Sequence, residues 1–404
     1  MTDAAVETDA EAALVNETLD RFLADHDVAA MDAFEFRGLR YDAGLAWVHF
    51  PEGRGGLGVR PSLQKEVEVR FHRAGGPPPP PTVFFGVALA GPTVVTHGSD
   101  EMIDRMLRPM FTGEDVWCQL FSEPGAGSDL ASLACRALKD GDEWLVTGQK
   151  VWNTVAHLAD YGLLVTRTDP DVPKHRGMTY FAVDMHAEGV EVRPLRQITG
   201  EAEFNEVYLT DVRIPDADRI GDEGDGWRVS MTTLMNERTT IGAGSGAPAR
   251  GTGPIAEAVR LWDEHPDQSP ATRDRLMKLW IDAEVLRLTN IRAGANRRAG
   301  NPGPEGSIAK LGFAEINQDI YEFCVDLQGA HGQIELDYEN KRADMIGLVG
   351  PPGTSRKMFL RSRANSIEGG TSEIQRNILG ERVLGLPGEP RTDKVLPWKD
   401  VPRS

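Results

Sequence analysis

The stretch QLFSEPGAGSDLAS, residues 119–132, marks the point where a helical sequence pattern gives way to a β-rich one. It begins with the apolar end of a β-run, a proline then turns the chain, and Gly125 and Gly127 allow the backbone to approach a ligand closely. Ser128 and Asp129 add a hydroxyl and a carboxylate. A loop of exposed N–H groups after a strand suits a flat polar heterocycle or a phosphate, although glycine content by itself favours an ordinary β-turn.

The sequence before this stretch predicts an N-terminal helical domain over residues 1–115. Apolar residues recur at the spacing of one helix face over residues 12–23, and a further helical stretch follows at 102–108. The proline run at 77–81 predicts a stiff, extended connector between them.

Residues 116–222 predict a middle β domain. Short β-rich runs with turn residues and no helices between them favour a small barrel or sandwich over a parallel βαβ sheet. These runs cover residues 144–147, 161–166, 179–183 and 190–192.

Residues 223–404 return to helical periodicity and predict a C-terminal helical bundle, so the expected fold class is α+β. The clearest helical patterns lie at 276–286 and 313–327. The last helix is expected to start near Thr371, with Ser372 and Gln375 as its capping box.

The composition is that of an ordinary globular protein, with 404 residues, 40% of them hydrophobic and 26% charged. A formal net charge of −18 argues against a surface that wraps nucleic acid or an anionic membrane. The acidic N-terminus does not look like a secretory signal, and the longest apolar run, residues 83–95, is too short to span a membrane. The three cysteines, Cys118, Cys135 and Cys324, lack metal-type spacing and the nine histidines are scattered. We therefore expect a cytoplasmic protein without a metal site.

Three motifs, in this order, carry a resemblance. Residues 119–132 contain SEPGAGSD, residues 148–154 read GQKVWNT, and residues 367–376 read IEGGTSEIQR. Together they resemble the acyl-CoA dehydrogenase family, and the likeness extends over nearly the whole chain. The resemblance implies an FAD-dependent enzyme that converts an acyl-CoA thioester to the trans-2-enoyl-CoA. A base would take the α proton while the β hydride passes to flavin N5.

Carried over position by position, the resemblance also implies a set of FAD contacts. Trp152 would flank the flavin ring and Thr154 would contact its reactive edge. Residues 328–332 would reach the ADP half of a flavin in a neighbouring subunit, with Asp326 as the other possible position of the family's Gln. The expected FAD contacts are Gln119, Phe121, Ser122, Gly127, Ser128, Trp152, Thr154, Gln328, Gly332, Thr371 and Glu373, and the expected substrate contacts are Ser128, Arg238 and Gly369.

The catalytic base departs from the commonest pattern of the family. Most members carry a glutamate immediately before the Gly-Thr of the closing motif, where this chain has Gly369. A minority, typified by isovaleryl-CoA dehydrogenases, supplies it from another helix just before an Arg, where this chain has Glu237 and Arg238. The resemblance thus implies Glu237 as the base and Arg238 as the residue that orients the base region, with Glu368 as the alternative. Such a carboxylate needs a dry pocket to work as a base near neutral pH.

Two departures bear on assembly and substrate. The family's R-K-T-F-G-like segment is absent, and LWDEHPDQSP stands at residues 261–270. Residues 304–312 and 374–387 resemble the actinobacterial subfamily that acts on bulky, often steroid-derived, CoA thioesters, some of whose members form α2β2 assemblies. The resemblance implies an electron-transfer flavoprotein as electron acceptor, and either a homo-oligomer (dimer or tetramer) or an α2β2 assembly.

Several alternatives stay open at this point. The chain could be a subunit that completes a partner's site without full activity alone, or an oxidase. The DNA-binding offshoot of the same fold is disfavoured by the charge of −18. The string GAGSGA at residues 242–247 satisfies a dinucleotide fingerprint, but no strand precedes it, so we interpret it as small-residue helix packing.

Overall fold

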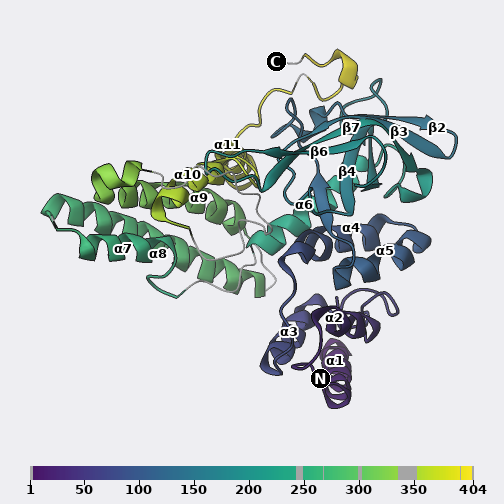
Figure 1. Cartoon of the computed structure of the whole chain (residues 1–404), viewed down its shortest axis with the longest axis horizontal. Helices are drawn as coiled ribbons and strands as arrows, with labels where there is room; N and C mark the ends of the chain where they lie inside the picture. Colours follow the sequence, from purple (N-terminus) through teal and green to yellow (C-terminus); the bar gives the residue numbers. More distant parts are fainter. Residues whose placement is uncertain are drawn as a thin grey trace.

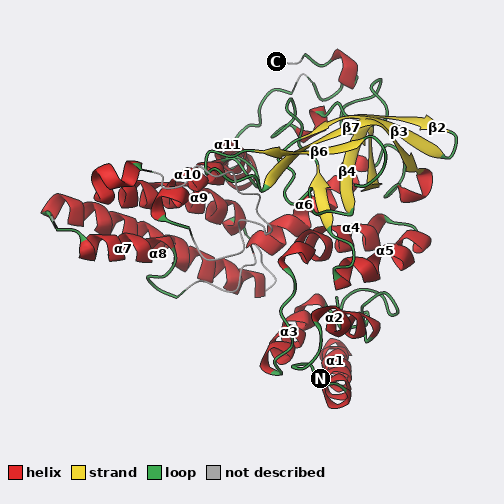
Figure 2. Cartoon of the chain, viewed as in Figure 1, coloured by secondary structure: helices red, strands yellow, loops and turns green. Residues whose placement is uncertain are grey.

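The computed structural model describes residues 3–242, 249–266, 268–298, 303–334, 353–391 and 393–402. Its elements follow the order helices, sheet, helices, which confirms the predicted α+β fold (Figures 1 and 2). The N-terminal helices lie below the sheet in this view, and the C-terminal bundle extends to its side.

The N-terminal helices form because their apolar residues share one face. The elements are α1 (Asp3–Asp25), α2 (Ala33–Asp42), α3 (Gln64–Arg73), α4 (Gly91–His97) and α5 (Asp100–Thr112). Helix α1 buries Val15, Leu19 and Phe22, as its periodicity predicts, in a small core shared with α2 and α3. The Ser99 side chain caps α5 by accepting the N–H of Met102. Helix α5 then packs its methionine-rich face against the sheet.

The middle part of the chain forms one seven-stranded, curled sheet with the order β1-β4-β2-β3-β7-β6, and β5 pairs with β4. The strands are β1 (Trp117–Leu120), β2 (Arg136–Asp140), β3 (Glu143–Lys150), β4 (Tyr161–Arg167), β5 (Met178–Asp184), β6 (Val190–Leu195) and β7 (Phe204–Pro215). Each predicted β-run lies within one of them. Strand β4 is buried on both faces: Leu163 faces the core with α4 and α5, and Leu164 faces the interior of the curl.

The C-terminal helices pack around α9. The elements are α6 (Gly226–Gly242), α7 (Pro254–Glu264), α8 (Pro270–Arg298), α9 (Glu305–Gln328), α10 (Ser355–Ser362) and α11 (Ser372–Ile378). Helix α9 contacts α7, α8, α10 and α11, while α6 contacts α4, β5 and α9. Helix α6 therefore joins the sheet to the bundle. None of the helices that the structure describes has both the length and the apolar character needed to cross a bilayer.

The predicted cap of the last helix is wrong by one residue. The Thr371 side chain, rather than that of Ser372, accepts the N–H of a residue in the first turn, Ile374, at 3.2 Å. The Gln375 amide donates back to the carbonyl of Gly369. Because Gly369 and the next glycine both have positive φ, the chain leaves its left-handed turn at Thr371, and this residue takes the cap position.

Candidate functional site

Residues 119–132, here called the glycine loop, leave β1 and fold back over the neighbouring strands. The Phe121 ring is buried and meets Tyr180 edge to face at 5.7 Å. The carbonyl of Ser122 accepts the N–H of Val151 at 2.9 Å. The structure thus brings the first two sequence motifs together.

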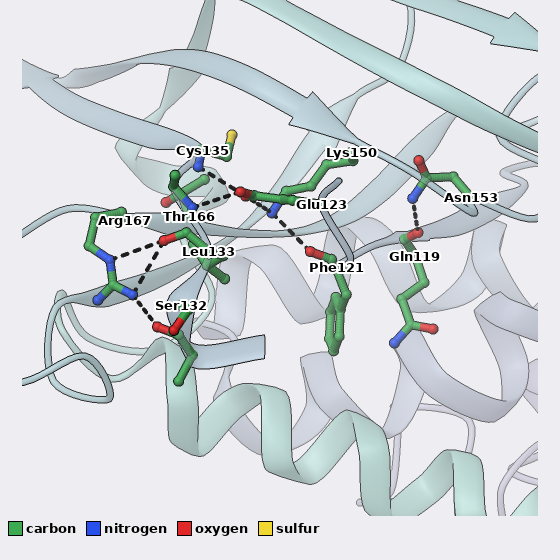
Figure 3. A network of polar contacts seen from close by, with 12 residues as sticks. Gln119, Phe121, Glu123, Ser132, Leu133, Cys135, Lys150, Asn153, Thr166 and Arg167 are labelled. Carbon is green, nitrogen blue, oxygen red and sulfur yellow. Dashed lines mark hydrogen bonds and ion pairs between the residues drawn. The ribbon is translucent and has the colours of Figure 1, made fainter. Parts of the chain in front are cut away.

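A buried ion pair fixes the first half of the glycine loop (Figure 3). The Lys150 Nζ lies 2.8 Å from Glu123 Oε1, and the two side chains are 0% and 8% exposed. Lys150 also donates to the carbonyl of Phe121 at 3.1 Å. The Glu123 carboxylate accepts the N–H groups of Ala134 (2.7 Å) and Cys135 (2.9 Å). The charges of Glu123 and Lys150, one from each of the first two motifs, are therefore satisfied by each other and by the backbone. We interpret Glu123 as a residue that holds the loop.

The open part of the glycine loop lies between its fixed ends. Gly125, Gly127 and Ser128 are exposed. A Cβ atom added at Gly125 or Gly127 would meet nothing within 4 Å. Asp129, expected to offer its carboxylate, is instead paired with Lys174 at 2.8 Å. A ligand that approaches this loop meets backbone and the Ser128 hydroxyl rather than a free carboxylate.

Two residues, one in the second motif and one directly after it, have a strained conformation. Trp152 and Val155 have φ values of +63° and +53°, a left-handed conformation that costs a non-glycine residue about 1–2 kcal/mol. The Trp152 side chain is 58% exposed and touches Phe204 edge to face. It is therefore no core residue, and Thr154 beside it is half-buried. Strain of this kind persists only where the surroundings enforce it and often marks a functional site.

Hydrogen bonds of Asn153 help to hold the backbone in this conformation. Its backbone N–H and C=O exchange hydrogen bonds with Asn205 at 3.0 and 3.1 Å. Its side-chain Nδ2 donates to the carbonyl of Gln119 at 2.8 Å, as Figure 3 shows. The Asn153 Oδ1 atom is buried and has no hydrogen-bond partner. The segment thus presents a buried acceptor beside an exposed indole.

A series of hydrogen bonds and ion pairs connects the closing motif to Val155, the residue that follows the second motif. The Glu203 carbonyl accepts the N–H of Val155, and its carboxylate lies 3.8 Å from Arg361. Arg361 in turn binds Glu368 at 2.9 Å. Asn365 donates to the same carboxylate at 2.8 Å. Glu368 is therefore held by a guanidinium and an amide, as suits a structural ion pair.

The other residues expected from sequence lie on the helices of the bundle. Thr371 caps α11, Glu373 is exposed in its first turn, and the Ser372 Oγ is buried without a partner. The Gln328 amide donates to the carbonyl of Cys324, within α9. A Cβ at Gly332 would lie 2.5 Å from the Val325 carbonyl oxygen, so packing alone requires glycine there.

Glu237 and Arg238 lie near the C-terminal end of α6, and their side chains lie outside the described part of the structure. The middle of α6 is held against α4 and β5, because the buried Thr233 hydroxyl lies 2.9 Å from the hydroxyl of Thr93 and 3.1 Å from that of Tyr180. Most of the segment 242–247 also lies outside the described residues. The part of the chain that the structure describes contains no group of His, Cys, Asp or Glu side chains that could hold a metal ion.

Sequence reasoning missed the residues that hold the site. Lys150 gave a usable signal, because it continues the inward positions of β3 marked by Trp144 and Val146. A lysine at such a position needs a buried partner. Arg167 and Lys174, which contact the far end of the glycine loop, gave no comparable signal in the sequence.

Comparisons with known proteins agree with the motifs. The models of the acyl-CoA dehydrogenase middle domain and C-terminal domain match residues 118–212 and 224–384. Acyl-CoA dehydrogenase IpdE1 of Mycobacterium tuberculosis is 37% identical over 349 residues, which are 86% of this chain and 86% of that protein. Acyl-CoA dehydrogenase FadE34 of the same organism is 37% identical over 362 residues, 89% of this chain, but the chain spans only 47% of that protein.

Solved structures of two-chain complexes have the same fold. The Tcur3481-Tcur3483 steroid ACAD superposes with a TM-score of 0.67 at 25% identity, covering 95% of this chain and 98% of that one. The ChsE4-ChsE5 complex from Mycobacterium tuberculosis gives a TM-score of 0.65 at 26% identity, covering 94% and 98%. The family resemblance inferred from the three motifs is confirmed.

Proposed function

The chain belongs to the acyl-CoA dehydrogenase family, and we propose that it forms the α,β double bond of a CoA thioester with a bulky, steroid-derived acyl chain. Membership of the family confirms the expected enzyme class and FAD as the cofactor. The observation that carries the proposal is the glycine loop, which is fixed at both ends while Gly125, Gly127 and Ser128 stay exposed. Its Ser122 carbonyl accepts the N–H of Val151, the residue before the exposed Trp152.

The residues of the site fit FAD. Bound FAD would supply the acceptor for the hydride that leaves the β carbon. The open sides of Gly125 and Gly127 leave room for a flat ring or a phosphate. Two polar atoms, Asn153 Oδ1 and Ser372 Oγ, are buried without a partner in segments expected to contact the cofactor. A flavin nucleotide offers donors and acceptors that could satisfy such atoms.

Glu237 is the base in this proposal and takes the α proton of the thioester. The engagement of Glu368 by Arg361 and Asn365 disfavours the alternative. Gly369, where most relatives carry the base, has a φ of +62°, a conformation that a glutamate would rarely adopt. Helix α6, which carries Glu237, contacts both β5 and α9, so the base would stand between the sheet and the bundle.

The Glu237→Gln variant tests this assignment. It keeps the size of the side chain but removes its basicity, so FAD and acyl-CoA should still bind while anaerobic bleaching of the flavin by substrate slows by roughly 10²–10⁴-fold. Glu368→Gln is the matched control and should retain bleaching. Normal bleaching in Glu237→Gln, together with its loss in Glu368→Gln, would move the role to Glu368.

The acyl group is proposed from the neighbours. One superposed structure is described as a steroid ACAD, and the resemblance of residues 304–312 and 374–387 points to the same substrate class. A panel of CoA thioesters tests the proposal. Turnover should be highest with polycyclic acyl groups, and activity confined to short straight chains would contradict it. Electrons would pass to an electron-transfer flavoprotein.

An exposed apolar face on α8 supports a multi-subunit enzyme. Its side chains are 41–58% exposed and recur every three or four residues; they are Met277, Ile281, Val285, Leu288 and Ile291. A continuous apolar stripe of this kind marks an interaction surface. We propose that it packs against another acyl-CoA dehydrogenase subunit, either a second copy of the chain or a different one.

A second candidate function is suggested by the departure at residues 261–270 and by the neighbouring structures. The missing R-K-T-F-G-like segment and the two-chain neighbours favour a subunit that completes its site only with a partner chain. Purifying the chain alone and measuring its mass and FAD per protomer separates the two. A yellow, active homo-oligomer supports the first function. A colourless chain that gains FAD and activity only with a second subunit supports the other.

A further inference from the structure

Residues 393–402, here called the C-terminal tail, lie against the β domain. Figure 1 shows this part of the chain, in yellow, above the sheet and away from the bundle that precedes it. Its backbone is bound there, because Trp398 N–H donates to the Val172 carbonyl (2.9 Å) and Lys399 N–H to the Pro170 carbonyl (3.0 Å). The tail lies beyond the region matched by the family's C-terminal model.

The tail reaches the far end of the glycine loop through Arg167, the last residue of β4. The Arg167 side chain is buried and donates to the carbonyl of Leu133 (Figure 3). It also donates to the carbonyl of Ala131. The Trp398 ring covers this guanidinium, with its centroid 4.9 Å from Cζ. The indole N–H of Trp398 also donates to the Ser132 carbonyl at 3.3 Å. A cation desolvated under an indole in this way is held more firmly than an exposed one.

A second connection runs through Lys174. Its Nζ lies 2.8 Å from Asp129 in the glycine loop and 2.5 Å from Asp393 in the tail, and its side chain is only 8% exposed. Burial of the ammonium opposes protonation, but the hydrogen bonds to the two carboxylates outweigh it and raise the pKa of Lys174. Asp129 directly follows Ser128 in the sequence. Through Lys174, the tail is therefore linked to the residue that directly follows the open part of the loop.

We propose that the C-terminal tail positions the glycine loop for ligand binding. Trp398 and Asp393 fix the far end of the loop, residues 129–132, through Arg167 and Lys174. The near end is fixed by the pair of Glu123 and Lys150. The exposed residues therefore lie between two fixed points, here called clamps. The first clamp, Glu123 and Lys150, belongs to the β domain alone, whereas the second also needs the tail. We expect the second clamp to contribute to ligand binding, because it helps to hold Gly125, Gly127 and Ser128, the residues that a ligand at this loop would meet.

The experiment compares four single variants of the full chain. Trp398→Ala removes both the ring and the indole N–H, and Trp398→Phe restores a ring over Arg167. Asp393→Asn removes the charge that faces Lys174 without touching Trp398. Lys399→Ala is the control, because the exposed Lys399 side chain pairs with the exposed Asp171 at 2.5 Å.

Hydrogen exchange of residues 125–133 is the first readout. We expect it to quicken roughly tenfold in Trp398→Ala, because one hydrogen bond and one cation–π contact are lost, with a smaller increase in Asp393→Asn. Trp398→Phe should return most of the protection, and Lys399→Ala should match the parent. Unchanged exchange in both Trp398→Ala and Asp393→Asn would overturn the proposal, since the tail would then merely cover the surface.

Ligand binding is the second readout, and its interpretation rests on the proposed function. Titration of the apoprotein with FAD and of the holoenzyme with acyl-CoA should show weaker binding in Trp398→Ala, with KM rising roughly five- to tenfold and kcat nearly unchanged. Faster exchange with unaltered FAD and acyl-CoA binding would reject the positioning role. If the chain oxidised no acyl-CoA, exchange and FAD titration would still decide the role of the tail, so the two failures are distinguishable.

Discussion

Replacing Lys150 with methionine tests how the glycine loop is held. The substitution keeps the volume of the side chain but removes the cation beside the Glu123 carboxylate, which is 8% exposed. Among the described residues, the N–H groups of Ala134 and Cys135 stay as its partners. Removing one member of a buried ion pair destabilises a protein by about 3–5 kcal/mol. The Phe121 carbonyl also loses the Lys150 ammonium. We therefore expect a loss of stability in that range, together with a loss of bound FAD.

Urea unfolding followed by tryptophan fluorescence is the assay, because Trp117 and Trp144 are fully buried in the β domain. Lys139→Met is the control, because Lys139 lies on an exposed position of β2. Its Nζ lies 5.3 Å from the centroid of the Trp144 ring, an interaction worth about 0.5–1 kcal/mol at an exposed site. Adding Glu123→Gln to Lys150→Met removes the unpaired charge and should recover part of the stability. If Lys150→Met were no less stable than Lys139→Met and kept its full complement of FAD, the ion pair would not be what holds the loop.

Two further predictions concern pH and backbone strain. Burial lowers the pKa of His49, His97 and His175, with Arg228 adding to the effect at His97 and Lys174 at His175. As the pH falls below about 6.5, the unfolded chain therefore binds more protons than the folded chain. The free energy of unfolding should be highest above that pH and decline below it. A constant free energy of unfolding in urea titrations between about pH 7.5 and 5.5 would contradict this reasoning. In Trp152→Gly, relief of the left-handed φ gains about 1–2 kcal/mol and the added chain entropy costs about 0.5–1 kcal/mol. The apoprotein should therefore be as stable as the parent or slightly more so by thermal unfolding, while FAD titration should show weaker binding; a marked loss of stability would mean that the exposed indole serves packing.

The architecture was predictable because its signals are local. Apolar spacing along residues 12–23 fixed the buried face of α1, and β-rich runs bounded by turns located strands such as β4 and β5. The misplaced cap shows the limit of this reasoning. Thr371 and Ser372 are both good capping residues, and the conformations of the two preceding glycines decide between them.

The candidate site was predictable only in its outline. The motifs located the glycine loop and Trp152, but the groups that hold them come from distant parts of the chain. Trp398 contacts a carbonyl 266 positions away, and no local pattern indicates such a partner. Glu368 illustrates a different limit. Its partners Arg361 and Asn365 are only seven and three residues earlier in the chain, but the spacing does not show that the side chains meet.

The charges around the glycine loop explain how a strongly acidic chain can receive an anionic CoA ester. The loop and its clamps contain three carboxylates: Glu123 pairs with Lys150, and Asp129 and Asp393 share Lys174. The guanidinium of Arg167 in the same network donates to backbone carbonyls. Three negative and three positive groups leave this network neutral. Charges farther away than the Debye length of about 8 Å act weakly at physiological ionic strength. The net charge of −18 therefore comes from groups outside this network, and an anion that approaches the exposed Ser128 meets a locally balanced site.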